Sequence, residues 1–139
     1  MALLEIKNLV KNYGDVEALK GISLSVEKGE VVVILGPSGC GKSTFLRTLN
    51  GLEPLKSGQL LLQNAGILGK DISWVKARQR IGMVFQSYEL FAHLSVIDNI
   101  LLGPLKVQKR DRAEAEKQAD ELLKRVGLYE RKNAYPREL

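Results

Sequence analysis

Residues 36–43 are the feature that most constrains what this chain can fold into. They read Gly-Pro-Ser-Gly-Cys-Gly-Lys-Ser, which fits the G-x-x-x-x-G-K-S/T pattern of a loop that holds the phosphates of ATP or GTP. An unbroken apolar run at 31–35 precedes the loop, and a helix-like segment at 42–50 follows it. Because the motif requires the order strand, glycine-rich loop, helix, the sequence predicts an α/β core that binds a nucleoside triphosphate.

The residue types in this loop suit the chemistry of a triphosphate. Glycines let the backbone curl closely around an anion, and backbone N–H groups at the start of the next helix supply a fixed positive potential. Lys42 is expected to reach the β- and γ-phosphates, Ser43 to offer its hydroxyl to Mg²⁺, and Thr44 to lie near the α-phosphate. Cys40 is interpreted as a small residue that fits, with an oxidisable thiol as the alternative. The candidate residues of the loop are Gly36, Pro37, Ser38, Gly39, Cys40, Gly41, Lys42, Ser43 and Thr44.

The overall composition is ordinary for one soluble globular domain, with 45% hydrophobic and 27% charged residues among 139. The single cysteine excludes an internal disulfide and fits a reducing compartment. No apolar stretch approaches the roughly 18 residues of a membrane span, and the N-terminus lacks the apolar core of a signal peptide. The net charge of +5 comes from interleaved signs, so we expect no nucleic-acid partner.

Alternating apolar residues predict two amphipathic strands before the loop, at 4–10 and 22–26, with a turn at 12–15 between them. These strands are expected to form a small antiparallel sheet beside a parallel core. The apolar runs at 31–35 and 81–85 predict two buried strands of that core. The other elements expected in this part are a helix at 42–50, a strand at 60–62 and a short basic helix at 72–80.

The last third of the sequence predicts a helical addition to the core. Ser95 is expected to cap a short helix at 96–100, which Gly103 and Pro104 end. Asp111 is expected to cap a longer helix. The predicted apolar stripe of that helix consists of Ala115, Ala119, Leu122, Leu123 and Val126.

Several motifs occur together at the spacing of one protein family. Tyr13 precedes the loop at 36–44, residues 84–86 read Val-Phe-Gln, and the segments 94–100 and 135–139 follow. Along its whole length the chain resembles the ATP-binding subunit of an ABC transporter. The resemblance implies a P-loop NTPase core of the ABC type, with N-terminal antiparallel strands and the beginning of a helical subdomain.

Two further stretches, at 91–95 and 102–107, are similar to those of bacterial importers of polar amino acids, glutamine-type systems included. The resemblance implies an α/β nucleotide-binding core at 1–92 and the start of the helical subdomain at 93–139. It also implies ATP and Mg²⁺ as the ligands.

The family resemblance also assigns roles outside the loop. Tyr13 is similar to the aromatic residue that stacks on the adenine ring, and Val16 is expected near the ribose and adenine. Gln86 is similar to the glutamine that contacts Mg²⁺ and the attacking water, so the implied metal ligands are Ser43 and Gln86. His93 is interpreted as a structural or interfacial residue.

Two protein partners are implied by the same resemblance, namely a second copy of the subunit and a transmembrane permease that binds the region Gln86–Leu94. The implied location is the cytoplasmic face of a bacterial inner membrane, as a peripheral protein. Tyr88, Leu90 and Phe91 would give the region an apolar contact surface, with inward packing as the alternative.

Parts of the family's catalytic set do not occur in these 139 residues. Leu139 stands where the L-S-G-G-Q signature would begin, and neither an apolar strand ending in Asp-Glu nor the later switch histidine is found. Lys42 and Gln86 contribute to catalysis, but we expect no complete catalytic site. The chain, truncated before the signature, is expected to bind ATP at most, and to expose an apolar face and an unpaired strand edge.

Two other functions agree with the phosphate loop. A soluble ABC protein acting in repair or translation usually carries long insertions or tandem cassettes, and this sequence shows neither. The other alternative is an unrelated P-loop enzyme such as a GTPase or a small-molecule kinase. Kinases of that kind typically begin close to their phosphate loop, whereas 35 residues with two predicted strands precede it here. The importer subunit is therefore the favoured interpretation.

Overall fold

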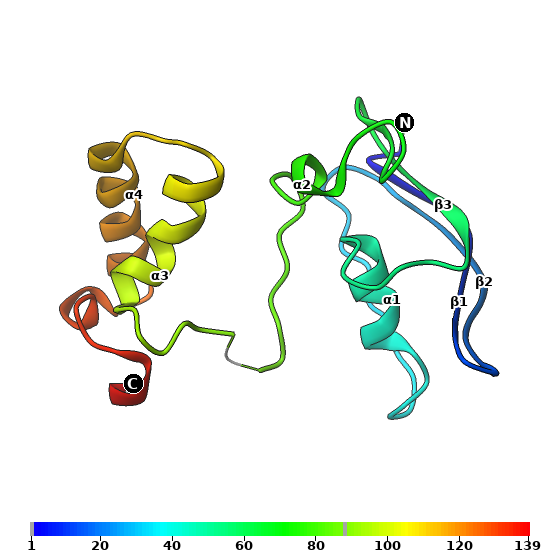
Figure 1. The fold of residues 1–139 in the computed structure, drawn as a ribbon, viewed down its shortest axis with the longest axis horizontal. Coiled ribbons are helices and arrows are strands. Elements are labelled where there is room, and N and C mark those ends of the chain that lie inside the picture. The colour runs from blue at the N-terminus through cyan, green and yellow to red at the C-terminus, as the bar shows by residue number, and fades with distance from the viewer. Residues whose placement is uncertain (1, 88) are drawn as a thin grey trace. The chain divides into compact units, whose positions relative to one another are not determined.

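The computed structural model describes residues 2–87 and 89–139, which form two compact units. The first unit extends to Met83 and the second begins at Val84. Each is described by itself. The described residues of the first unit form a sheet and two α-helices, and those of the second are mostly helical (Figure 1).

The first unit is built on an antiparallel sheet with the strand order β2-β1-β3-β4. β1 (Leu4–Tyr13) and β2 (Val16–Val26) form a long hairpin with its turn at 14–15. β3 (Ser57–Leu62) pairs with the other side of β1, and the short β4 (Gly66–Ile67) pairs with β3. The antiparallel sheet predicted at the N-terminus is confirmed.

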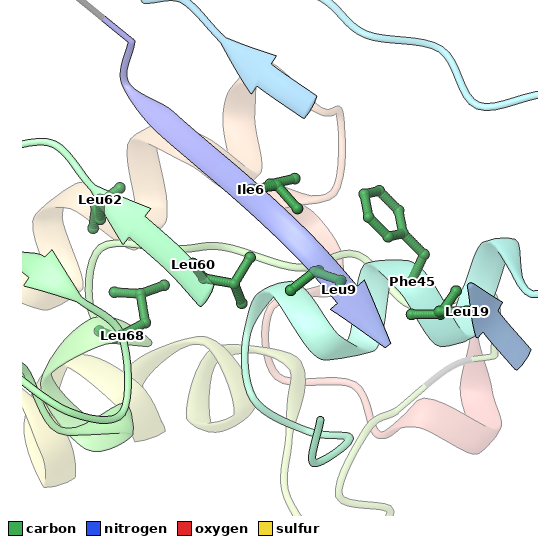
Figure 2. Packing of buried hydrophobic residues seen from close by; sticks show 8 residues of the cluster. Ile6, Leu9, Leu19, Phe45, Leu60, Leu62 and Leu68 are labelled. Atoms are coloured by element: carbon green, nitrogen blue, oxygen red, sulfur yellow. The ribbon is translucent and has the colours of Figure 1, made fainter. Parts of the chain in front are cut away.

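Helix α1 (Lys42–Leu49) packs on this sheet through one aromatic side chain, Phe45. Figure 2 shows the Phe45 ring among side chains of the hairpin, with Leu9 and Leu19 close by. Thr48, on the next turn, is fully buried, and its hydroxyl donates to the carbonyl of Phe45 at 2.6 Å. The apolar core consists of Ile6, Leu9, Leu19, Phe45, Leu60, Leu62, Leu68 and Ala77.

The C-terminus of α1 is held by an arginine that follows α2 (Trp74–Ala77). The guanidinium of Arg78 donates from Nε to the carbonyl of Asn50 at 2.9 Å and from Nη2 to that of Gly51 at 2.8 Å. A cation on the last carbonyls of a helix is favourable. The helix predicted at 72–80 is shorter than expected because the chain tightens into an i→i+3 turn, in which Arg80 N–H donates to the Ala77 carbonyl.

The prediction of two parallel strands at 31–35 and 81–85 is wrong for the described residues. Both segments are irregular, and Val31 is 87% and Val84 98% exposed. A strand forms only when it has a partner, and the described ladders all join β1–β4 in antiparallel pairs. Most of the apolar side chains of the 31–35 run therefore face solvent, which confirms the exposed apolar surface expected from the sequence.

The second unit contains α3 (Val96–Leu102), a π-helical segment η1 (Gly103–Val107) and α4 (Arg112–Arg125). Two short 3-10 turns follow, η2 (Tyr129–Arg131) and η3 (Pro136–Glu138). α3 and α4 are drawn side by side in Figure 1 and contact each other.

Both helix caps predicted in this unit are confirmed. The Ser95 hydroxyl accepts from the Asp98 N–H at 3.2 Å, and the Asp111 carboxylate accepts from the Glu114 N–H at 3.1 Å. Each cap satisfies a backbone donor that the first turn of the helix leaves without a partner.

Two features of this unit differ from the expectation. The α-helix does end at Leu102, directly before Gly103 and Pro104 as predicted, but the chain continues as a π-helical segment, whose first turn tolerates proline. That segment closes with an i→i+5 bond from the Gln108 N–H to the Gly103 carbonyl. The apolar stripe of α4 is narrower than predicted, since Leu122 and Val126 are exposed. The small core of the unit is formed by Leu101, Ala115 and Ala119.

Replacing Phe45 by alanine should lower the free energy of unfolding by about 3–5 kcal/mol, the usual cost of removing a buried aromatic ring. Phe45 is 5% exposed, whereas its neighbour Leu46 is 47% exposed, so Leu46→Ala should cost under about 1 kcal/mol. Urea denaturation followed by circular dichroism measures both. Phe45→Leu provides a milder variant if the alanine protein does not fold, and equal losses at the two positions would refute the packing described here.

Candidate nucleotide-binding site

The loop at 36–43 turns closely against the hairpin at its last glycine. Gly41 precedes α1 with φ at 96°, a left-handed conformation that favours glycine. A Cβ built on Gly41 would lie 2.9 Å from the carbonyl oxygen of Ala18 in β2. Two independent constraints, backbone conformation and space, therefore require glycine at the point where the loop enters the helix.

The N-terminus of α1 is arranged to receive an anion. No side chain among the described residues caps this helix, and its first turn contains no acidic residue. The Phe45 N–H donates to the Gly41 carbonyl at 2.8 Å and closes the first turn of the helix, which contains Lys42, Ser43 and Thr44. The N–H groups at the start of a helix carry a partial positive charge that favours phosphate.

The Lys42 ammonium lies inside the curl of the loop. Its Nζ donates to the carbonyl of Gly36 at 2.8 Å and to that of Pro37 at 2.6 Å, and it lies 3.5 Å from Cys40 Sγ. An ammonium has three donors and no acceptor, and a phosphate oxygen is a stronger partner for it than a neutral carbonyl. Lys42 is thus already directed at the space that the loop encloses.

The remaining residues of the loop and of the first helical turn are small. Cys40 is exposed and not in a disulfide, and its Sγ lies close enough to Gly36 that a Cβ there would approach to 2.7 Å. Ser38 is exposed at the loop surface, and Gly39 has φ at 79°. The hydroxyl-bearing Ser43 is exposed in the first turn of α1. This donor set fits a Mg²⁺-bound triphosphate, because Mg²⁺ prefers hard oxygen ligands and keeps phosphate and water in its shell.

Tyr13 and Val16, which the sequence predicts to contact the adenine and the ribose, lie in the same unit at the turn end of the hairpin. They face each other across the ladder, and Tyr13 is 45% exposed. Val16 is two residues before Ala18, the residue whose carbonyl adjoins Gly41. The hairpin therefore carries both the aromatic residue and the carbonyl that the end of the loop at 36–43 approaches closely.

Gln86 belongs to the second unit, where it is exposed. In the region Gln86–Leu94, Leu90 and Phe91 are exposed, and Tyr88 lies outside the described residues. The His93 ring contacts the Phe91 ring edge-on, with the centroids 6.0 Å apart.

One residue that holds this region was missed from the sequence. Asn99 of α3 accepts from the Phe91 N–H at 2.9 Å and donates to the carbonyls of Phe91, Leu94 and Ser95. One accepted hydrogen bond, together with three carbonyls that share the two hydrogens of the amide NH2, thus fixes the segment that leads into α3. The sequence did offer a signal for this role, because asparagine is a poor helix former and Asn99 lies inside a predicted helix. A polar side chain in such a position often bonds the backbone.

The comparisons with known proteins agree with this geometry. A family model described as ABC transporter matches residues 19–139. A glutamate/aspartate import ATP-binding protein of Escherichia coli K12 is 47% identical over 137 residues, which are 99% of this chain and 57% of that protein. A glutamine transport ATP-binding protein of the same strain is 46% identical over the same shares. The chain thus spans about 57% of the length of these curated relatives.

The chain also resembles solved structures of ABC transporter components. An ATP-binding cassette of an ABC transporter superposes with a TM-score of 0.78 at 27% identity, over 100% of this chain and 59% of that one. Part of an ABC transporter complex from Clostridium perfringens superposes with a TM-score of 0.79 at 34% identity, over 99% of this chain and 55% of that one.

Gly41→Ala should weaken triphosphate binding about tenfold or more, since left-handed strain of order 1–3 kcal/mol adds to the collision with the Ala18 carbonyl. Gly82→Ala is the matched control, because a Cβ there has nothing within 4 Å and its φ is not left-handed. Isothermal titration calorimetry measures both affinities. Unchanged affinity in Gly41→Ala would show that the close approach at Ala18 does not shape the loop.

Proposed function

Because the chain belongs to the ABC transporter family, we propose that it binds Mg·ATP at 36–44 as the N-terminal part of an importer's ATP-binding subunit. Membership confirms the fold class expected from the sequence, an ABC-type nucleotide-binding domain with N-terminal antiparallel strands. The observation that carries the proposal is the Lys42 ammonium inside the loop at the uncapped start of α1.

On this proposal the phosphates lie between the loop and the first turn of α1. Lys42 exchanges its bonds to the Gly36 and Pro37 carbonyls for bonds to the β- and γ-phosphates. The N–H groups of 39–44 bind phosphate oxygens, and Thr44 is assigned to the α-phosphate. When bound, Mg²⁺ neutralises phosphate charge, and Ser43 and Gln86 are the side chains assigned to hold it.

The base is assigned to the turn end of the hairpin. Tyr13 stacks on the purine, and Val16 contacts the ribose and the purine edge. Support comes from the exposed ring of Tyr13 and from its position on the hairpin that fixes the loop through Ala18. Stacking of an aromatic side chain on a base contributes roughly 1–3 kcal/mol.

The cargo of the whole protein is proposed to be a polar amino acid. Relatives are named for import of glutamate and aspartate, for transport of glutamine, and, at 42% identity in Bacillus subtilis, for transport of arginine. These cargoes share a charged or polar side chain, and their names support import over repair, translation, kinase or GTPase functions.

The proposed partners are a second copy of the subunit and a membrane permease that contacts Gln86–Leu94. Exposed Leu90 and Phe91 support an apolar contact there. We place the protein at the cytoplasmic face of a bacterial inner membrane and assign it no nucleic-acid partner. Among the described residues, no helix is both long and apolar enough to cross a bilayer.

The 139 residues are proposed to bind ATP without turnover, since their sequence contains neither the L-S-G-G-Q signature nor an apolar strand ending in Asp-Glu. An enzyme-coupled phosphate-release assay tests this directly. ATPase activity that disappears in Lys42→Ala would disprove it, because the activity would then come from this site.

Lys42→Ala should weaken ATP binding by about ten- to a hundredfold, since charge-assisted hydrogen bonds contribute about 1.5–3 kcal/mol each. Adenosine binding should change little, because the lost ammonium faces the phosphates. Lys28→Ala, at an exposed turn lysine, removes the same charge away from the loop and should leave both affinities unchanged. Calorimetry with ATP and with adenosine decides the matter, and equal losses for the two ligands in Lys42→Ala would remove the basis of the assignment.

A further inference from the structure

Lys11 of β1 is a buried lysine that the proposed site does not use. It is 8% exposed, whereas Lys7 on the same strand is exposed. Burying a charge is costly unless the charge has a partner. The Lys11 ammonium has two, because its Nζ lies 3.3 Å from Glu53 Oε2 and 4.7 Å from the centre of the Tyr13 ring, over the face of that ring.

Glu53 is itself fixed relative to α1. Its backbone N–H and that of Leu52 both donate to the Arg47 carbonyl, at 3.3 and 2.9 Å. The same connection returns to β1, where the Lys56 N–H donates to the Val10 carbonyl at 2.9 Å. The carboxylate that holds the Lys11 ammonium therefore extends from the end of the helix whose first residue is Lys42.

We propose that Lys11, held by Glu53, is a positioning residue that orients the Tyr13 ring to receive the adenine base on the face away from the ammonium. This inference rests on the proposed function, in which Tyr13 stacks on the base. A half-exposed ring at a hairpin end can rotate, and fixing it before binding removes the entropy cost of ordering it in the complex. A cation over a ring face supplies the attraction that holds it.

The Lys11–Glu53 ion pair also connects the residues proposed to bind the two ends of the nucleotide. The Lys11 ammonium contacts the Tyr13 ring and pairs with Glu53. The backbone of Glu53 is in turn bonded to Arg47 in the last turn of α1, the helix that begins at Lys42. The ring that faces the base and the ammonium that faces the phosphates are thus positioned from the same helix. A positioning role predicts that Lys11 affects binding of the base and leaves binding of the phosphates unchanged.

The test compares Mg·ATP with inorganic triphosphate and Mg²⁺, which lacks the base, by calorimetry on the 139-residue chain. Tyr13→Ala should weaken ATP binding about tenfold, and Lys11→Met about threefold, with inorganic triphosphate unaffected in both. The double variant should bind ATP no more weakly than Tyr13→Ala, and Lys11→Arg should retain most of the affinity. Lys7→Met is the matched control, since Lys7 also pairs with an acid at 3.3 Å, Glu5, but on the exposed surface.

Equal losses of ATP and inorganic triphosphate in Lys11→Met would assign Lys11 a general structural role and overturn the proposal. So would a further loss of ATP affinity when Lys11→Met is added to Tyr13→Ala. Aromatic ¹H–¹³C spectra of the ligand-free chain decide the ring contact independently. The Tyr13 ring resonances should shift in Lys11→Met and not in Lys7→Met, and unchanged resonances would overturn the proposal. If the wild-type chain binds neither ligand while the resonances shift as expected, the proposed function fails and takes the base-orienting role of Lys11 with it, although the contact between Lys11 and the Tyr13 ring is confirmed.

Discussion

The packing of Phe45 on the hairpin is the interaction on which the rest of the first unit depends. Burial of this ring fixes α1 on the sheet, and the start of α1 carries both Lys42 and the uncapped backbone N–H groups. The end of the loop before α1 also lies close to the hairpin, since a Cβ on Gly41 would come within 2.9 Å of the Ala18 carbonyl oxygen in β2. Arg78 stabilises the opposite end through the carbonyls of Asn50 and Gly51. The geometry of the proposed anion site thus follows from how α1 packs on the β1–β2 hairpin.

What the sequence predicted well was decided by local interactions. The hairpin follows from alternation on two adjacent strands, and the caps at Ser95 and Asp111 follow from side chains that bond a backbone N–H three residues later. The loop at 36–43 is equally local, because Lys42 donates to the carbonyls of Gly36 and Pro37 within the loop itself. Patterns of this kind carry their own physical cause, so they can be interpreted without knowing the rest of the fold.

What the sequence predicted poorly depends on partners far away in the chain. The run at 31–35 is apolar enough for a buried strand, yet no described strand pairs with it. The burial of Lys11 depends on Glu53, which comes from the other end of α1, and neither residue stands out in the sequence. The same holds for Arg78, whose carbonyl partners lie in the preceding connection. Such pairs become visible only when the fold brings the two segments together.

The residues assigned to the nucleotide and its metal belong to two different units. The groups proposed to hold the base and the phosphates, Tyr13 and Lys42, belong to the first unit and are linked there through α1 and the hairpin. Gln86 belongs to the second unit, in which Asn99 fixes residues 91–95 through hydrogen bonds to Phe91, Leu94 and Ser95. Gln86 is the residue of the second unit proposed to hold the metal, and it is also the first residue of the region proposed to contact the permease.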